Sequence, residues 1–556
     1  KGRPVIAANG LSITERIFYA SKPGRPQVVM GIMIRLRPPP TLSPSKFTVT
    51  RIIDLLRLAA ASHYRLISYI DPQTMLCHRL GNTVADFHLP HRIVPRGSGE
   101  DSWRNEATWE TVFREEINRT FDTSDTSKPL WRVALIVPPE MMEGEGERRV
   151  GRVEGGALRP YVELMHTFHH CLGDGLSMFS FSRSFLDLCD KERFDVEDLK
   201  LGEVELTTVP PPVLDNLVNP SVFEVLPVAT GMAFRFLSGK RHRKFKGRVE
   251  GEAPPTTTST APTEQKPLMA APSTSVSTAS LPTAVPIPRP LTNPTSGTLT
   301  RFLWFDSDFI SALRKKSKSE GTTIAAVLVV NALAAVRSTY ATWDKYRRKP
   351  LPSRQGWVVT NSVRHMLPGS RLIHGADKQS DPASMVFGGY SGSVMNANLH
   401  LSDTHAFWER ARVVRRAISK CLRSSIARLK LVNYVYRHPK LWAYVNSKAD
   451  LAKMSRAYSV EVANLGAWDY PAALPTASPS DTRARLEHFA GVVNSSFDGV
   501  RGLFTLGVIT LAGNMSIAVA YDASAVSEED ADVFVGAFAE GLRRVKEAEG
   551  RISIMD

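Results

Sequence analysis

The sequence predicts an α/β protein built from two halves of similar size. Apolar runs of strand length alternate with amphipathic helical segments, and 556 residues are too many for one compact core. Between about Lys240 and Thr298 the composition changes to Pro, Ser, Thr and Ala with few large apolar residues. Such a segment cannot bury enough surface to fold alone. We therefore expect an N-terminal half at 1–239, a disordered linker at 240–298 and a C-terminal half at 299–556.

The N-terminal half is expected to start with a capped helix at 11–19, because Ser12 and Glu15 have the spacing of a capping box. Expected strands follow at 28–36, 64–70, 129–137 and 161–169, and expected helices at 45–61, 108–118 and 176–188. A glycine- and charge-rich insertion at 140–156 separates the last two strands, which predicts an antiparallel pair.

The C-terminal half shows the same alternation. Its expected strands are 297–305, 357–364 and 458–465, with a hairpin of 502–512 and 514–521 about Gly513, and its expected helices are 307–321, 322–338, 404–423 and 527–547. The apolar run Ile324–Val336 is short and contains Asn331, so it predicts a buried helix and not a membrane span.

The net charge of +15 favours an anionic partner. The one dense basic run, Lys240–Arg248, reads as a solvated linker, and no zinc-finger spacing or RNA-binding aromatic signature indicates nucleic acid. The apolar stretch Val222–Leu237 precedes that run, so peripheral contact with an anionic membrane stays open as an alternative. The four cysteines form no CxxC pair, which fits a reducing compartment.

One stretch carries the candidate chemistry: Tyr161-Val-Glu-Leu-Met-His-Thr-Phe-His-His-Cys-Leu-Gly-Asp-Gly-Leu-Ser177. Strand alternation puts His166 and His170 on one face and His169 on the other. On a strand, His166 and His170 lie about 13 Å apart, which disfavours a shared zinc with Cys171 or Asp174. An imidazole fixed at a strand end suits a general base, and that role is expected for His170. Asp174 is expected to hold the following loop, with a direct His–Asp pair as the weaker alternative.

The stretch His169-His-Cys-Leu-Gly-Asp-Gly175 resembles the HHxxxDG motif of the superfamily that shares the chloramphenicol-acetyltransferase fold. This superfamily includes peptide-synthetase condensation domains, plant HxxxD acyltransferases, wax-ester synthase/diacylglycerol acyltransferases and fungal alcohol acetyltransferases. The DFGWG element of the plant branch is absent from the sequence.

Four other stretches extend the resemblance over nearly the whole chain outside the linker. Pro129-Leu-Trp131 resembles the PLW element of wax-ester synthases, and Gly321-Thr-Thr-Ile-Ala-Ala-Val-Leu328 resembles the superfamily's second-half helix. Asn464-Leu-Gly466 is similar to the SNLG element of alcohol acetyltransferases, with Ala463 in place of Ser, and Asn361-Ser-Val-Arg364 with Leu367-Pro368 is similar to another strand of that branch. Ile67 stands where condensation domains carry the arginine that pairs with the motif's aspartate, so Arg65, Arg132 and Arg364 are the candidate partners of Asp174.

The resemblance implies an α+β sandwich fold with two chloramphenicol-acetyltransferase-like halves and a channel between them. It implies an enzyme, an O-acyltransferase that moves an acyl group from acyl-CoA to an alcohol of lipid or secondary metabolism. His170 would be the base and Asp174 the second residue of the catalytic motif, and His169, Gly173 and Gly175 would support them. Asn464, or the backbone N–H groups near Gly173–Gly175, would bind the oxyanion.

Arg364 would contact the CoA phosphates, and no metal or permanently bound cofactor is expected. We expect a cytoplasmic monomer, with a peripheral position on the endoplasmic reticulum or lipid droplets as the alternative. Two other functions stay open: a condensation domain that uses carrier-bound substrates to form amides or esters, and a non-catalytic binding protein of the same fold.

Overall fold

The structure, a computed structural model, describes most of the residues in both halves. The described residues are 7, 9–19, 27–40, 42–96, 106–138, 141, 161–196, 198–210, 226, 230, 297–343, 354–362, 391–401, 406–423, 425–436, 459–468, 484–493 and 502–548. The predicted insertion at 140–156 apart from Met141, the linker at 240–298 apart from its last two residues, and nearly all of Val222–Leu237 lie outside the described residues.

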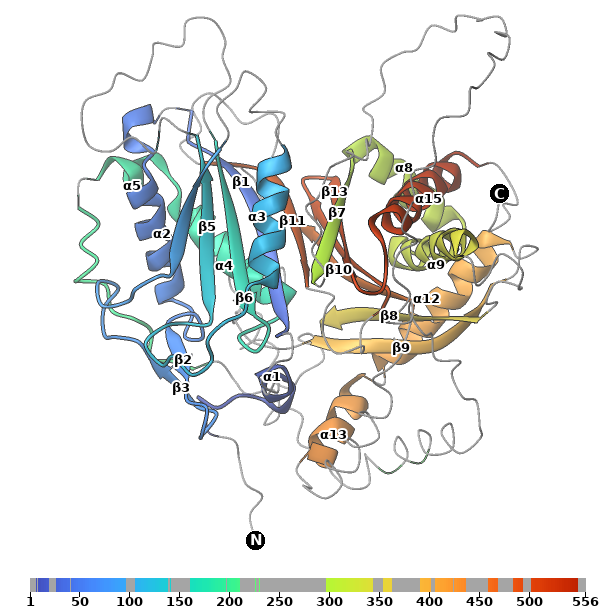
Figure 1. Cartoon of the computed structure of the whole chain (residues 1–556), viewed down its shortest axis with the longest axis horizontal. Helices are drawn as coiled ribbons and strands as arrows, with labels where there is room; N and C mark the ends of the chain where they lie inside the picture. Colours follow the sequence, from blue (N-terminus) through green and yellow to red (C-terminus); the bar gives the residue numbers. More distant parts are fainter. Residues whose placement is uncertain are drawn as a thin grey trace, which may run out of the picture.

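The first half is a five-stranded mixed sheet in the order β11-β1-β6-β5-β4 (Figure 1). Its strands are β1 (Val29–Arg37), β4 (His91–Pro95), β5 (Trp131–Val137), β6 (Val162–His169) and β11 (Arg485–Val493). Helices α2 (Val49–Ala61) and α4 (Gly175–Leu188) pack on each other over one face, and α3 (Glu106–Asn118) contacts β1, β5 and β6. The predicted antiparallel pairing of 129–137 with 161–169 is confirmed, with His166 opposite Val133.

The second half is a six-stranded mixed sheet in the order β7-β13-β12-β10-β8-β9. Its strands are β7 (Thr298–Phe305), β8 (Arg354–Ser362), β9 (Ser391–His400), β10 (Val460–Trp468), β12 (Phe504–Leu511) and β13 (Asn514–Asp522). Its main helices are α8 (Ser307–Ser319), α9 (Ile324–Thr342), α12 (Phe407–Arg423) and α15 (Glu528–Glu547). Figure 1 shows these helices on the side of the sheet away from the first half.

Two sequence predictions for the second half are confirmed. The 502–521 hairpin forms about Gly513, whose φ of 86° is in the left-handed region that favours glycine. Helix α9 has the length and hydropathy to cross a membrane, but 72% of its most apolar window is buried inside the protein. It packs against α15 and α12, as expected of a core helix.

Several short elements complete the described structure. They are α1 (Ile13–Tyr19), the 3-10 helix Pro44–Lys46, β2 (Ser68–Ile70), β3 (Cys77–Arg79), α5 (Lys191–Asp195) and α13 (Ser425–Tyr436). The strand predicted at 64–70 is shorter than expected, because residues 64–67 form a turn before β2.

The two halves are joined by more than the connecting segment. Strand β11 comes from the C-terminal part of the chain but pairs with β1 as the edge of the first sheet (Figure 1). On α3, Trp109 and Phe113 pack against Phe302 of β7 at ring-centroid distances of 4.6 and 5.2 Å. The predicted division by sequence position therefore does not describe the sheets completely, since the first sheet needs a strand from beyond residue 299.

Candidate functional site

The histidine pair lies where β6 ends. His169 is the last strand residue, and its N–H donates to the carbonyl of Leu130 at 2.9 Å. The N–H of His170 donates to the carbonyl of Val28 at 2.8 Å, and the N–H of Leu172 turns back to the carbonyl of His169 at 3.0 Å. These bonds to both neighbouring strands fix the backbone of the turn. His169 is fully buried, whereas His170 is only half-buried.

His169 has the environment of a structural residue. Its Nδ1 accepts a hydrogen bond from the N–H of Cys171 at 3.3 Å, and its ring lies near the rings of Tyr19 and Phe121. Burial, and then the neighbouring His170, lower the pKa of His169 to about 3. A neutral imidazole that accepts from the turn's own backbone shapes the loop, which is the role expected for it.

His170 lies against the N-terminal helix. The ring of Phe18 on α1 is 4.2 Å from the His170 ring between centroids, at an interplanar angle of 30°. Helix α1 starts with the predicted capping box: the N–H of Glu15 donates to Ser12 Oγ at 3.3 Å, and the N–H of Ser12 donates to Glu15 Oε2 at 2.6 Å. Sequence reasoning predicted this helix but did not assign Phe18 to the site, since nothing local connects α1 with the motif.

Asp174 is the N-cap of α4. Its Oδ1 accepts from both the N–H and the Oγ of Ser177 at 2.9 Å, and the N–H of Asp174 donates to Ser177 Oγ at 3.3 Å. A carboxylate at a helix N-terminus also interacts favourably with the helix dipole. These contacts support the expectation that Asp174 anchors the loop. Buried Gly173 precedes it in the turn.

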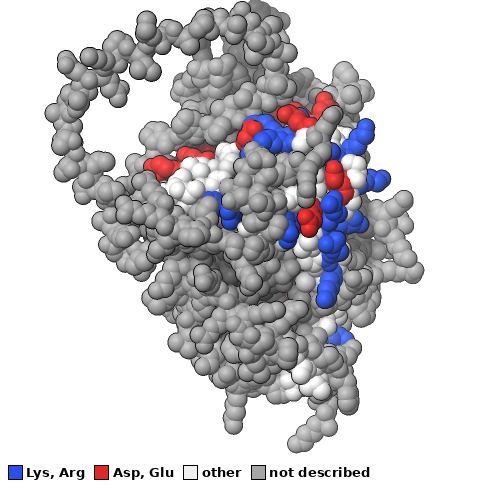
Figure 2. Space-filling view, turned by 90° about the vertical axis from the view of Figure 1, so that its right-hand side faces the viewer, with Lys and Arg blue, Asp and Glu red and all other residues white. Residues whose placement is uncertain are grey.

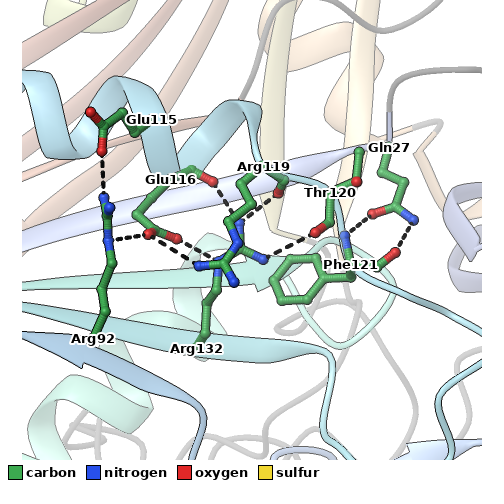
Figure 3. A network of polar contacts seen from close by, with 8 residues as sticks. All are labelled: Gln27, Arg92, Glu115, Glu116, Arg119, Thr120, Phe121 and Arg132. Carbon is green, nitrogen blue, oxygen red and sulfur yellow. Dashed lines mark hydrogen bonds and ion pairs between the residues drawn. The ribbon is translucent and has the colours of Figure 1, made fainter.

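Two of the three arginines considered as partners of Asp174 bind other carboxylates. Arg65 is buried and forms an ion pair with Glu15 at 3.3 Å. Arg132 forms an ion pair with Glu116 and donates to the carbonyl of Glu116 at 2.8 Å (Figure 3). The third, Arg364, lies outside the described residues.

The Arg132 network also supports the histidine turn. Its guanidinium lies 4.2 Å from the centre of the Phe121 ring, and Gln27 holds the backbone of Phe121 through hydrogen bonds to both its N–H and its carbonyl (Figure 3). Phe121 in turn packs edge-on against His169. Arg132 therefore has a structural role beside the motif.

At Gly175, the second half of the chain contacts the motif. A Cβ on Gly175 would lie 2.4 Å from Cδ2 of Leu465 on β10, far inside van der Waals contact. The sequence analysis implied a supporting role for this glycine, and the structure gives the reason. Gly175 is the first residue of α4 and has no left-handed φ, so its function is to allow the close approach of Leu465.

The same contact brings the Asn464-Leu-Gly466 element beside the motif. Gly466 has a φ of 90°, and its N–H donates to Asn464 Oδ1 at 2.9 Å. This bond occupies the side-chain oxygen and orients the amide, which leaves Nδ2 as a donor. Two residues further, Trp468 stacks on Phe179 of α4 at 5.2 Å.

His166, which precedes the motif, has a different environment from the two motif histidines. It is fully buried among Phe168, Phe181 and Phe185, and neither ring nitrogen has a hydrogen-bond partner in the described part of the chain. Burial lowers its pKa to about 3. Among the described residues, no group of three His, Cys, Asp or Glu side chains is placed to hold a metal ion.

Comparison with known proteins supports the fold. The sequence matches no protein-family model and no curated protein. The structure is similar to the TRI3 trichothecene 15-O-acetyltransferase from Fusarium sporotrichioides, with a TM-score of 0.59 and 10% identity over 97% of this chain and 95% of that one. It is also similar to the EpoB NRPS cyclization-docking bidomain from Sorangium cellulosum, with a TM-score of 0.56 and 12% identity over 98% and 88%.

The chain has the chloramphenicol-acetyltransferase-like, condensation-domain fold. The first condensation domain of the calcium-dependent antibiotic synthetase agrees, with a TM-score of 0.53 and 12% identity over 99% of this chain and 98% of that one. At such low identity these likenesses establish the fold, including both halves of this condensation-domain-like chain, and do not establish its substrates.

Proposed function

We propose that the chain is an O-acyltransferase that transfers an acyl group from acyl-CoA to an alcohol, with His170 as general base. The observation that most supports this proposal is the position of His170. This half-buried residue lies in the turn before α4, and Leu465 of the other half contacts α4. Substrates that enter between the halves, along the expected channel, would meet the imidazole there. The likeness of fold to an acetyltransferase and to condensation domains supports acyl transfer.

In the proposed reaction, His170 takes the proton of the acceptor hydroxyl as the oxygen attacks the thioester carbonyl. The C–S bond then breaks, and the imidazolium returns the proton to the thiolate of CoA. The oxyanion of the tetrahedral intermediate needs fixed donors. Asn464 Nδ2 is our candidate because its amide is already oriented by Gly466. The backbone N–H groups near Gly173–Gly175 are the other candidates, and Arg364 remains our candidate for the CoA phosphates.

The test is an assay of the full chain with acyl-CoA thioesters of several chain lengths and a mixture of alcohols, read by mass spectrometry. Loss of a positioned general base costs about 100- to 10,000-fold, so His170→Ala should lower kcat by that factor. His88→Ala is the matched control, since His88 is exposed on the surface. Turnover by His170→Ala at the rate of the His88→Ala control would refute the proposal.

A carrier-dependent condensation activity is the second candidate, because EpoB and the antibiotic-synthetase domain resemble the chain about as well as TRI3 does. The acyl donor that supports turnover separates these two functions. Turnover with free acyl-CoA supports the first function. Turnover only with acyl groups on a pantetheinylated carrier protein, again dependent on His170, supports the second.

A further inference from the structure

Helices α8 and α12 present a group of exposed cations. Six exposed basic residues form what we call the α8–α12 face: Arg314, Lys315 and Lys318 on α8, and Arg415, Arg416 and Lys420 on α12. Figure 2, which views this side of the molecule, shows basic side chains with acidic side chains among them in the described part of the surface.

Direct contacts make the two helices one surface. Arg412 Nη1 donates to the carbonyl of Glu320, directly after α8, at 3.1 Å. Arg415 Nη1 donates to the carbonyl of Gly321 at 2.6 Å. These bonds place the C-terminal end of α8 beside the middle of α12.

The six cations have no carboxylate partner among the described residues. Two nearby acids are already engaged, since Glu320 pairs with Lys316 and Arg412, and Glu409 pairs with Arg410. The adjacent helix α15 differs, because Arg543 and Arg544 both pair with Glu540, and Lys546 pairs with Glu547. A group of like charges without counter-charges repels itself, and an anionic partner would remove that cost.

The surface also indicates what kind of anion it fits. Among the described residues, no large hydrophobic side chain on α8 or α12 is exposed. Specific protein interfaces have a buried apolar or aromatic anchor, and single-stranded nucleic acid is bound by stacking on aromatic rings. An anionic bilayer needs neither, since each Lys or Arg near its surface contributes about 1 kcal/mol.

We propose that the α8–α12 face binds the surface of a membrane that contains anionic lipids. This face is separate from the 222–237 stretch considered in the sequence, and it is independent of the proposed chemistry at His170. Binding is electrostatic and peripheral, so it is reversed by salt.

The test is sedimentation of the full chain with vesicles of phosphatidylcholine alone or with one quarter phosphatidylserine. The test variant Lys315→Gln/Lys318→Gln/Arg416→Gln keeps the Arg412 and Arg415 contacts between the helices. The control Arg543→Gln/Arg544→Gln/Lys546→Gln removes the same charge from α15. Folding of both variants is checked by circular dichroism.

We expect the wild-type chain to bind only the vesicles with phosphatidylserine and to be released at about 0.5 M salt. Loss of three contacts of about 1 kcal/mol each lowers the partition coefficient of the test variant about 100-fold. The control should stay within about twofold of wild type. An equal loss of vesicle binding in both variants would show an effect of net charge only, and would overturn the proposal. No binding to either vesicle, with capture of an acidic protein or an RNA instead, would also overturn the proposal.

Discussion

At the residue scale, buried neutral histidines make the stability of the protein depend on pH. Burial lowers the pKa of His63 to about 4 and of His166 to about 3, against an ordinary value of 6.5. The unfolded chain therefore takes up protons first as the pH falls. The contribution of these two histidines to the free energy of unfolding should be constant above pH 6.5. Below pH 6.5, each such histidine should lower the free energy of unfolding by roughly 1 kcal/mol per pH unit, until the pH reaches the pKa of that histidine in the folded protein.

His166 allows this prediction to be tested. His166→Leu removes a titrating group whose ring nitrogens have no partner in the described structure. Urea unfolding at pH 7 and at pH 4.5 should show a smaller loss of stability in the variant, by about 2 kcal/mol. At pH 7 the variant should be at least as stable as wild type, since an unsatisfied polar group has gone. The same dependence on pH in both proteins would contradict the assignment of His166 as a neutral core residue.

At the element scale, the contact between α4 and β10 holds the two halves in register at the motif. Gly175→Ala would put a methyl group 2.4 Å from Leu465 Cδ2, so the Leu465 side chain, β10 or the turn must move. Leu465→Ala removes that clash. We expect Gly175→Ala to lower both stability and kcat, and the double variant to recover by about 1–2 kcal/mol relative to the sum of the single changes.

The control for this double-mutant cycle is Gly536→Ala. Gly536 is in the interior of α15, and a Cβ there would meet nothing within 4 Å. Alanine in a helix interior is favoured over glycine by about 0.8–1.0 kcal/mol, so this variant should be slightly more stable. Additive effects of Gly175→Ala and Leu465→Ala would mean that the two residues do not act through their contact.

The elements also show what the sequence could and could not predict. Periodicity and capping signals predicted α1, β5, β6 and the β12–β13 hairpin, because those signals are local. Strand β11 was not predicted, since it is recognised only by its pairing with β1, more than 440 residues earlier in the chain. The contacts of Phe18 with His170 and of Leu465 with Gly175 were missed for the same reason.

At the scale of the whole molecule, β11 makes the two halves one cooperative structure. Residues 1–239 alone would lack β11 and expose the edge of β1, a surface prone to aggregation. Phe489 of β11 packs against Phe179 of α4 and Trp468 of β10 at ring-centroid distances of 5.1 and 5.0 Å, so removing the strand also opens an aromatic cluster. The first half should therefore not be stable without the second.

A protease site inserted near residue 265, in the predicted linker, tests this cooperativity. The cleaved chain should elute as one species in gel filtration. Its urea unfolding should show a single transition by both tryptophan fluorescence and circular dichroism, as one cooperative unit does. Residues 1–239 expressed alone should be insoluble. Separation of the cleaved halves, or two resolved transitions, would mean that β11 adds little to the first sheet. In that case the contact between Leu465 and Gly175 could not keep Asn464 beside the histidine turn, and the site proposed for acyl transfer would not be maintained.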